Sequence, residues 1–179
     1  MDRRKIKNDE LQRLSTEEFK KEKKNPIVVV LDNVRSLNNV GSVFRTCDAF
    51  LVEKIYLTGI TGQPPHREIQ KTALGATESV EWEYETEVVE TIKKLKRESY
   101  MILAVEQVSD GKLLSEYFPD KTLKYVLVFG NEVFGVSEGV IELVDDCIEI
   151  PQLGTKHSLN IAVAVGIVVW DLWQKLEHK

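Results

Sequence analysis

Apolar and polar residues follow one another along the chain in blocks of two kinds. Short apolar runs rich in β-branched residues are typical of buried strands, and between them apolar residues recur at helical spacing. The predicted strands are residues 27–32, 54–59, 79–84, 100–106, 125–130 and 147–151. The predicted helices are residues 39–50, 67–74, 86–98, 137–144 and 160–176. This alternation favours an α/β fold with a mostly parallel central sheet and helices on both faces.

The first 24 residues lack this alternation. Leu11, Leu14 and Phe19 form one weak helical stripe, and Asn25-Pro26 breaks the chain after it. A solvated tail and a short helix that docks on the body or touches a substrate are both compatible with this stripe. We therefore expect a basic polar N-terminal extension at residues 1–25 and one domain at residues 26–179.

The composition is that of a globular protein. Of the 179 residues 42% are hydrophobic, which is enough to bury a core without disulfides or a metal. The longest apolar run, residues 161–170, is half as long as the roughly 20 residues that a membrane-spanning helix needs. Cys47 and Cys147 are too far apart for a CxxC pair, and the N-terminus has no signal-peptide pattern. Reduced thiols in a cytoplasmic protein are therefore expected.

Charge is unevenly distributed along the chain. The net charge of −5 does not by itself indicate a nucleic-acid-binding protein. The first 24 residues, however, hold nine Lys and Arg against six Asp and Glu. A local basic surface can still bind phosphate on a protein that is acidic overall.

Three loops hold most of the glycine, asparagine and charged residues that a core does not explain. They follow the predicted strands at 27–32, 125–130 and 147–151, and ligands of an open parallel sheet bind beyond such carboxyl ends. The chain has no GxGxxG after its first strand, no GxxxxGK[ST], no HExxH, no GxSxG and no Cys/His cluster. Dinucleotide, P-loop, zinc and standard hydrolase sites are therefore unsupported, and no metal is expected.

Each of the three loops contains a block that resembles one family. The blocks are NNVGSVFRTCDAF at 38–50, LVFGNEVFGVS at 127–137 and IPQLGTKHSLNIAVA at 150–164. Together, and in this order, they resemble the SpoU-type, TrmH-like branch of the SPOUT-class RNA methyltransferases, over about residues 26–176. One departure is Ala162, which stands where family members commonly have a serine.

The resemblance implies both an activity and an architecture. It implies S-adenosylmethionine as cofactor, transfer of its methyl group to a ribose 2′-hydroxyl of structured RNA, and a homodimer as the working unit. It also implies a deep trefoil knot in the C-terminal half. Because no separate N-terminal RNA-binding domain is visible, recognition falls to short tails and surface loops, and tRNA is favoured over rRNA.

The resemblance also implies roles for individual residues. The matching catalytic positions are Arg45, Asn39, Glu132, Ser158 and Asn160. The matching cofactor-binding positions are Val105, Gly130, Asn131, Gly135, Ile150, Pro151 and Leu159. The candidates for contact with RNA are Arg35, Arg67, Lys71 and Lys156.

Several of these residues have more than one interpretation. Family proposals make the arginine at the position of Arg45 the general base, but a guanidinium is almost always charged, so Arg45 is equally interpreted as a phosphate clamp. Asn39 and Ser158 suit helix N-caps as well as the site. Glu132 suits a proton acceptor, a counter-charge for Arg45 or a structural ion pair. Gly130 and Gly135 suit close approach of backbone to the cofactor or a plain turn.

The sequence leaves three alternatives to this function open, each of which it disfavours. Methyl transfer to a base atom is disfavoured by Arg45 and the Ser158-Leu159-Asn160 block. A non-catalytic RNA-binding or cofactor-sensing module is disfavoured because Asn39, Arg45, Glu132 and Asn160 are all present. A flavodoxin-like protein is disfavoured by the missing phosphate-loop glycines. The last helix, apolar nearly all round, independently suggests a dimer.

Overall fold

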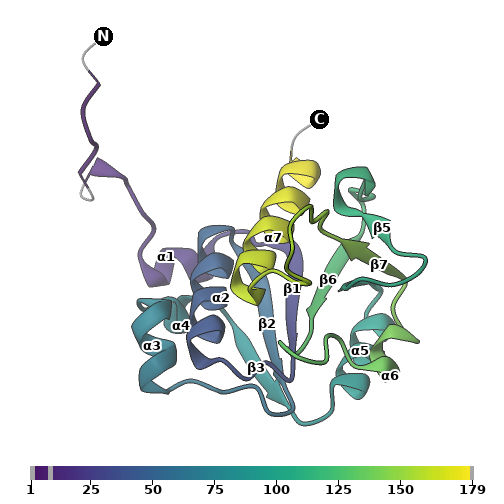
Figure 1. The fold of residues 1–179 in the computed structure, drawn as a ribbon. Helices are drawn as coiled ribbons and strands as arrows, with labels where there is room; N and C mark the ends of the chain where they lie inside the picture. Colours follow the sequence, from purple (N-terminus) through teal and green to yellow (C-terminus); the bar gives the residue numbers. More distant parts are fainter. Residues whose placement is uncertain (1–2, 8–9, 178–179) are drawn as a thin grey trace.

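A computed structural model describes residues 3–7 and 10–177 and contains a twisted parallel sheet between two layers of helices (Figure 1). The strands are β1 (Asn25–Asp32), β2 (Val52–Thr58), β3 (Trp82–Glu85), β4 (Tyr100–Val105), β5 (Lys112–Leu113), β6 (Lys124–Phe129) and β7 (Asp146–Glu149). Their order is β3-β2-β1-β6-β4-β7-β5, and every neighbouring pair is parallel. The predicted α/β class with a mostly parallel sheet is confirmed.

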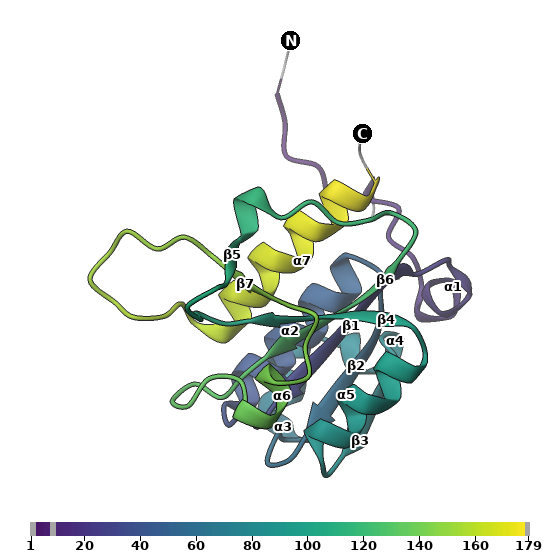
Figure 2. The ribbon, with the colours of Figure 1, turned by 90° about the vertical axis from the view of Figure 1, so that its right-hand side faces the viewer.

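Helices cover both faces of the sheet, as expected (Figures 1 and 2). They are α1 (Thr16–Lys21), α2 (Leu37–Ala49), α3 (Arg67–Ala73), α4 (Ala76–Ser79), α5 (Val88–Arg97), α6 (Glu138–Ile141) and α7 (Ile161–Glu177). Alternate residues of β1 enter different cores: Val29 belongs to the core under α2 and α7, and Val28 to the core under α5 and α6. A strand buried on both faces accounts for the continuous apolar run 27–31.

The N-terminal extension contains a helix that docks on the body. Ser15 and Glu18 form a capping box that starts α1. Phe19 is only 4% exposed and belongs to the main core. The docking alternative is therefore correct for residues 16–21. The predicted stripe is wrong in part, because Leu11 and Leu14 are exposed.

Two local predictions need correction. Residues 79–84 do not form one strand: Ser79 ends α4, and β3 starts only at Trp82. The apparent alternation arises because Val80 is buried at the end of α4. The prediction also missed β5 and the 3₁₀ turn at Leu114–Glu116, because β5 has two exposed residues and so no periodicity.

Gly41 allows α3 to pack closely on α2. A Cβ atom at this position would lie 2.1 Å from Thr72 Oγ1 and 2.3 Å from the Ile69 carbonyl oxygen, far inside contact distance. Thr72 Oγ1 also donates a hydrogen bond to the Asn38 carbonyl at 3.0 Å. The close approach therefore fixes α3 against the first half of α2.

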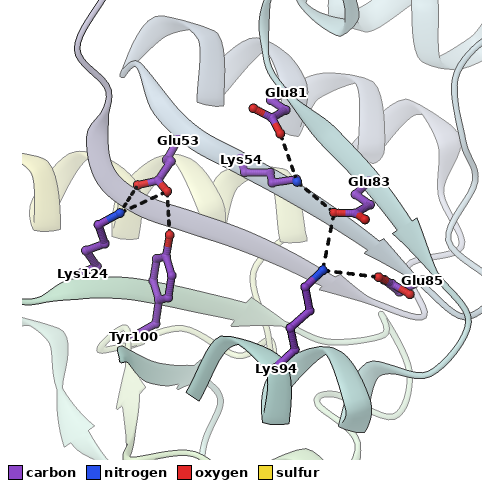
Figure 3. Close-up of polar contacts among 8 residues, drawn as sticks. All are labelled: Glu53, Lys54, Glu81, Glu83, Glu85, Lys94, Tyr100 and Lys124. Atoms are coloured by element: carbon purple, nitrogen blue, oxygen red, sulfur yellow. Dashed lines mark hydrogen bonds and ion pairs between the residues drawn. The ribbon is translucent and has the colours of Figure 1, made fainter. Parts of the chain in front are cut away.

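The acidic residues around β3 are paired with lysines (Figure 3). Lys54 Nζ lies 3.0 Å from Glu81 and 2.8 Å from Glu83, and Lys94 Nζ lies 3.8 Å from both Glu83 and Glu85. Because these pairs are largely solvated, each adds little stability. Their effect is to neutralise part of a surface that would otherwise repel phosphate.

A second polar group in Figure 3 marks the amino end of the sheet. Tyr100 donates a 2.6 Å hydrogen bond to Glu53, and Lys124 Nζ lies 3.4 Å from the same carboxylate. Burial, and then the Glu53 carboxylate, raise the pKa of the Tyr100 hydroxyl. These residues stand at or near the starts of β4, β2 and β6, opposite the ends that carry the three family-like loops.

Candidate active site

A cleft of about 760 Å³ lies beyond the carboxyl ends of β4, β6 and β7. Its lining includes the predicted catalytic residues Asn39, Glu132, Ser158 and Asn160 and the predicted cofactor-binding residues Val105, Gly130, Asn131, Gly135, Ile150 and Leu159. The structure therefore brings the three loops together at one edge of the sheet, where a parallel sheet is expected to bind its ligand.

The segment 130–135 is a tight, braced turn at one wall of the cleft. The backbones of Asn131 and Gly135 exchange two hydrogen bonds of 2.9 Å. Asn131 Oδ1 accepts from the N–H groups of Val133 and Phe134 at 2.8 and 3.1 Å, and Asn131 Nδ2 donates to the Asn33 carbonyl at 2.7 Å. A Cβ at Gly130 would lie 2.0 Å from the Gly135 carbonyl carbon, so this turn requires glycine there.

Two carboxylates that the sequence analysis missed hold the chain after this turn. Glu106 accepts from the Val136 N–H at 2.9 Å, and buried Asp32 accepts from the Ser137 N–H at 2.8 Å. Both carboxylates stand at carboxyl ends of strands, which was a usable signal for their location. No sequence pattern, however, indicates that their partners are backbone N–H groups of residues 136 and 137.

Glu132 connects the turn to the start of α2. Its carboxylate accepts from the backbone N–H groups of Arg35 at 3.0 Å and Ser36 at 3.1 Å, and from Asn39 Nδ2 at 3.4 Å. Burial raises the pKa of the Glu132 carboxyl, but these hydrogen bonds outweigh burial and hold the pKa below its usual range. Glu132 is thus an ionised residue that positions the 35–39 segment.

Asn39 and Asn160 continue this chain of hydrogen bonds across the cleft. Asn160 Nδ2 donates to Asn39 Oδ1 at 3.2 Å, and Asn160 Oδ1 accepts from the Ala162 N–H at 2.9 Å. Asn160 therefore caps α7 while it contacts Asn39. The helix N-cap expected as one alternative at Asn39 is Ser36, whose hydroxyl accepts from the Asn39 N–H.

Comparison with known proteins agrees with this arrangement. Residues 26–170 match the sequence profile described as the SpoU rRNA Methylase family. The chain belongs to this family.

Named relatives act on two kinds of RNA. The tRNA (guanosine(18)-2′-O)-methyltransferase of Thermus thermophilus is 30% identical over 162 residues, 90% of this chain and 81% of that enzyme. A 23S rRNA (guanosine-2′-O-)-methyltransferase of Neisseria meningitidis is 28% identical and covers 80% of this chain and 56% of that enzyme.

Solved structures of relatives have the same fold. The Aquifex aeolicus TrmH/SpoU tRNA modifying enzyme superposes with a TM-score of 0.78 at 30% identity, over 89% of this chain and 79% of that one. An AdoMet-bound rRNA methyltransferase from Sinorhizobium meliloti has a TM-score of 0.78 at 25% identity, over 88% of this chain and 59% of that one.

In this SpoU-family chain Arg45 does not line the cleft. It borders a second cavity of about 520 Å³, together with Lys71 of α3 and Gly166 of α7. Arg45 stands six positions after Asn39, which corresponds to about 9 Å along a helix and a rotation of about 240°, so the two side chains point in different directions. Glu132 accepts hydrogen bonds from the segment that starts α2. The prediction that Glu132 is a counter-charge for Arg45 is therefore wrong.

The other predicted residues are distributed around these two cavities. Pro151 lies outside the lining of the cleft, although Ile150 and Gln152 on either side belong to it. Arg35, Arg67 and Lys156 are exposed, and Lys71 Nζ lies 4.0 Å from Glu68. Cleft residues absent from the prediction include Glu106, Gln107, Phe134, Glu149, Gln152 and His157.

The described part of the chain contains neither a metal-ligand cluster nor a helix suited to a membrane. Between residues 3 and 177, apart from 8 and 9, no group of three or more His, Cys, Asp or Glu is placed to hold a metal ion. Over the same ranges, no helix has the length and apolarity needed to cross a membrane.

Proposed function

We propose that the chain transfers the methyl group of S-adenosylmethionine to a ribose 2′-hydroxyl of RNA, so that the methyl–sulfur bond breaks, S-adenosylhomocysteine leaves and the hydroxyl proton passes to solvent. The observation that carries this proposal is the chain of hydrogen bonds from Glu132 through Asn39 to Asn160 at the cleft. It joins residues from all three family blocks at one place. The named relatives, which are RNA 2′-O-methyltransferases, support the same reaction.

The cleft fits the proposed cofactor. Its lining combines apolar side chains such as Val105, Ile150 and Leu159 with the close backbone approach at Gly130. It also holds the carboxylates of Glu106 and Glu149, which suit a ligand that carries sulfonium and ammonium charges. When bound, the cofactor supplies the electrophilic methyl group.

The residues of the chain have separate tasks in this proposal. Asn39 and Asn160 present amide groups at the cleft and hold each other in position, so they orient the ribose. Glu132 positions Asn39 and is not the proton acceptor, because its oxygens already accept three hydrogen bonds. Ser158 belongs to the same wall and is proposed to contact the cofactor or ribose.

Arg45 is proposed to act on the phosphate side of the RNA. Lys71 borders the same cavity, and two cations at one cavity favour a polyanion. A phosphate held by Arg45 sits beside the 2′-hydroxyl of its own nucleotide, so the clamp also positions the nucleophile. Arg45 as the general base remains the alternative. Arg35, Arg67 and Lys156 are proposed to add further phosphate contacts.

A homodimer formed through α7 is part of the proposal. One face of α7 is buried in the core, but Val163, Ile167 and Trp170, at i, i+4 and i+7, form an exposed apolar stripe. Gly166 of the same helix borders the cavity of Arg45. A second copy on this stripe covers the apolar surface and lies beside Arg45.

Three finer points complete the proposal. The substrate is tRNA rather than rRNA, which is supported by the tRNA enzymes of Thermus thermophilus and Aquifex aeolicus, matched over 81% and 71% of their length against 59% for an rRNA enzyme of equal identity to the first. The protein acts in the cytoplasm as a basic extension, residues 1–25, followed by a methyltransferase domain, residues 26–179. The C-terminal half forms a trefoil knot, which the family resemblance supports. A knot depends on how the chain passes through its own loops, and the strand order does not describe this.

The proposed function is tested by mapping 2′-O-methylated nucleotides in total RNA from cells with and without this protein. We expect one or a few sites, in tRNA, to lose methylation when the protein is removed, and to regain it with the wild-type chain. Restoration by the chain carrying Asn39→Ala would contradict the role of the cleft. Loss of a base methylation instead would support the alternative reaction.

A further inference from the structure

An exposed aromatic ring stands at the mouth of the cleft. Phe134, in the 130–135 turn, is 85% exposed, although it is one of the cleft residues. Phe129 and Ile148 are buried in the floor of the cleft, whereas Val133 and Leu159 are also exposed but carry no aromatic ring. Phe134 is thus accessible to a ligand that approaches from outside the cofactor region.

The ring is carried by a scaffold that also positions Asn39. Asn131 Oδ1 accepts the Phe134 N–H at 3.1 Å, and the Asn131–Gly135 bridge closes the turn beneath it. Glu132, two residues before Phe134, contacts the start of α2 and Asn39. The backbone at Phe134 and the Asn39 amide are therefore held at a fixed separation.

The charges at this wall favour a neutral, planar group. Glu106, Glu132 and Glu149 line the cleft near the turn, and these carboxylates repel a phosphate. The cations Arg45 and Lys71 lie at the second cavity instead. Consider a nucleotide whose phosphate lies at these cations and whose ribose lies at Asn39. Its base is then free to contact an apolar surface.

We propose that Phe134 stacks on the base of the nucleotide that is methylated, an inference that rests on the proposed function. Unpaired bases in RNA are commonly held by stacking on aromatic side chains, which tolerates any base because each has a π-face. Phe134 then holds the base while Asn39 and Asn160 hold the ribose.

A double-mutant cycle, in which the ring and the base are removed singly and together, tests this contact. The probes are two RNA transcripts. One is an unmodified transcript that the wild-type chain methylates, and the other has an abasic ribose at the methylated position. Affinity for both is measured with the full chain saturated with S-adenosylhomocysteine, so that no turnover occurs. The variants are Phe134→Ala, Phe134→Leu and Phe134→Trp, with Phe118→Ala as a control that is 81% exposed and outside the cleft.

The expected result is a coupled loss. Phe134→Ala weakens binding of the intact transcript about 5- to 150-fold, the range for loss of one base–aromatic stack. Phe134→Leu behaves like alanine, Phe134→Trp stays within about twofold of wild type, and Phe118→Ala has no effect. Removing the base weakens RNA binding by the wild-type chain by a similar factor. It leaves RNA binding by Phe134→Ala unchanged, because the two changes remove the same contact.

Other outcomes overturn the inference. Equal losses for the abasic transcript in wild type and Phe134→Ala show that ring and base do not interact. A weaker affinity for S-adenosylmethionine in Phe134→Ala, measured by calorimetry, with RNA affinity unchanged assigns the ring to the cofactor. If the wild-type chain methylates RNA and Phe134→Ala binds RNA with wild-type affinity, only this inference fails. If wild type methylates no RNA, the proposed function fails with it.

Discussion

Replacing Glu132 by glutamine tests whether this residue positions Asn39 or accepts a proton. The carboxylate accepts hydrogen bonds from Arg35 N at 3.0 Å, Ser36 N at 3.1 Å and Asn39 Nδ2 at 3.4 Å. Glutamine keeps one acceptor oxygen but puts an N–H donor in place of the other. At least one of the two backbone donors therefore loses its partner.

The size of the effect follows from these contacts. A hydrogen bond to a charged group contributes about 1.5–3 kcal/mol, and solvent screening at this exposed residue lowers the value. We expect Glu132→Gln to lower the free energy of unfolding by about 1–2 kcal/mol, or the Tm by about 3–6 °C. Displacement of Asn39 should lower the single-turnover methyl-transfer rate about 10- to 100-fold.

The pH dependence of stability follows from the lowered pKa of the Glu132 carboxyl. Because the pKa of the Glu132 carboxyl is lowered in the folded protein, its contribution to stability is full above the unfolded value of about 4.3. That contribution is lost as the pH falls through the folded pKa. A positioning carboxylate is ionised throughout neutral pH, so it contributes no slope to the rate there.

The assay combines urea denaturation, calorimetry with S-adenosylmethionine and single-turnover kinetics, with Glu142→Gln as control. Glu142 is exposed and lies outside the cleft. Glu132→Gln should bind the cofactor within about threefold of wild type, because Glu132 contacts α2 rather than the apolar floor. Unchanged stability together with complete loss of turnover would refute the positioning role and make Glu132 the base.

Four further substitutions test the rest of the site and the proposed dimer. Leu159→Arg should weaken S-adenosylmethionine binding about tenfold or more by placing a charge in an apolar wall, and unchanged affinity in calorimetry would remove this loop from the cofactor site. Arg45→Ala should abolish methyl transfer with cofactor binding nearly intact, and a near wild-type single-turnover rate would exclude both roles of Arg45. Arg45→Lys should lose most activity and raise the RNA KM if Arg45 clamps phosphate, whereas a rate that climbs with pH would indicate a base. Trp170→Glu should convert a dimer into a species near the chain mass of 20.5 kDa in sedimentation, and a wild-type protein already at that mass would contradict the dimer.

The sequence sufficed for the features that depend on local pattern. The run 27–31, buried on both faces, indicated a parallel strand of an α/β sheet, and the three loops at strand ends indicated the site. The boundary at 79–84 failed because a buried Val80 imitates the alternation of a strand. Phe19 shows the opposite case, in which a weak pattern becomes a docked helix through tertiary contacts.

The arrangement within the site was harder to predict. That Arg45 and Asn39 point in different directions follows from their six-residue spacing in a helix, so this signal was present in the sequence. The partners of Glu132, Glu106 and Asp32 include backbone N–H groups from other loops. Such contacts depend on the position of the backbone and leave no mark in the identity of the donating residue.

The most direct test of the proposed reaction is to follow where a labelled methyl group goes. The purified chain is incubated with methyl-labelled S-adenosylmethionine and unmodified tRNA transcripts, and the RNA is then hydrolysed with alkali. Alkaline cleavage needs a free 2′-hydroxyl, so the account predicts that the label is recovered in alkali-resistant dinucleotides. The Asn39→Ala variant should give none. Label recovered in mononucleotides as a methylated base would contradict the account.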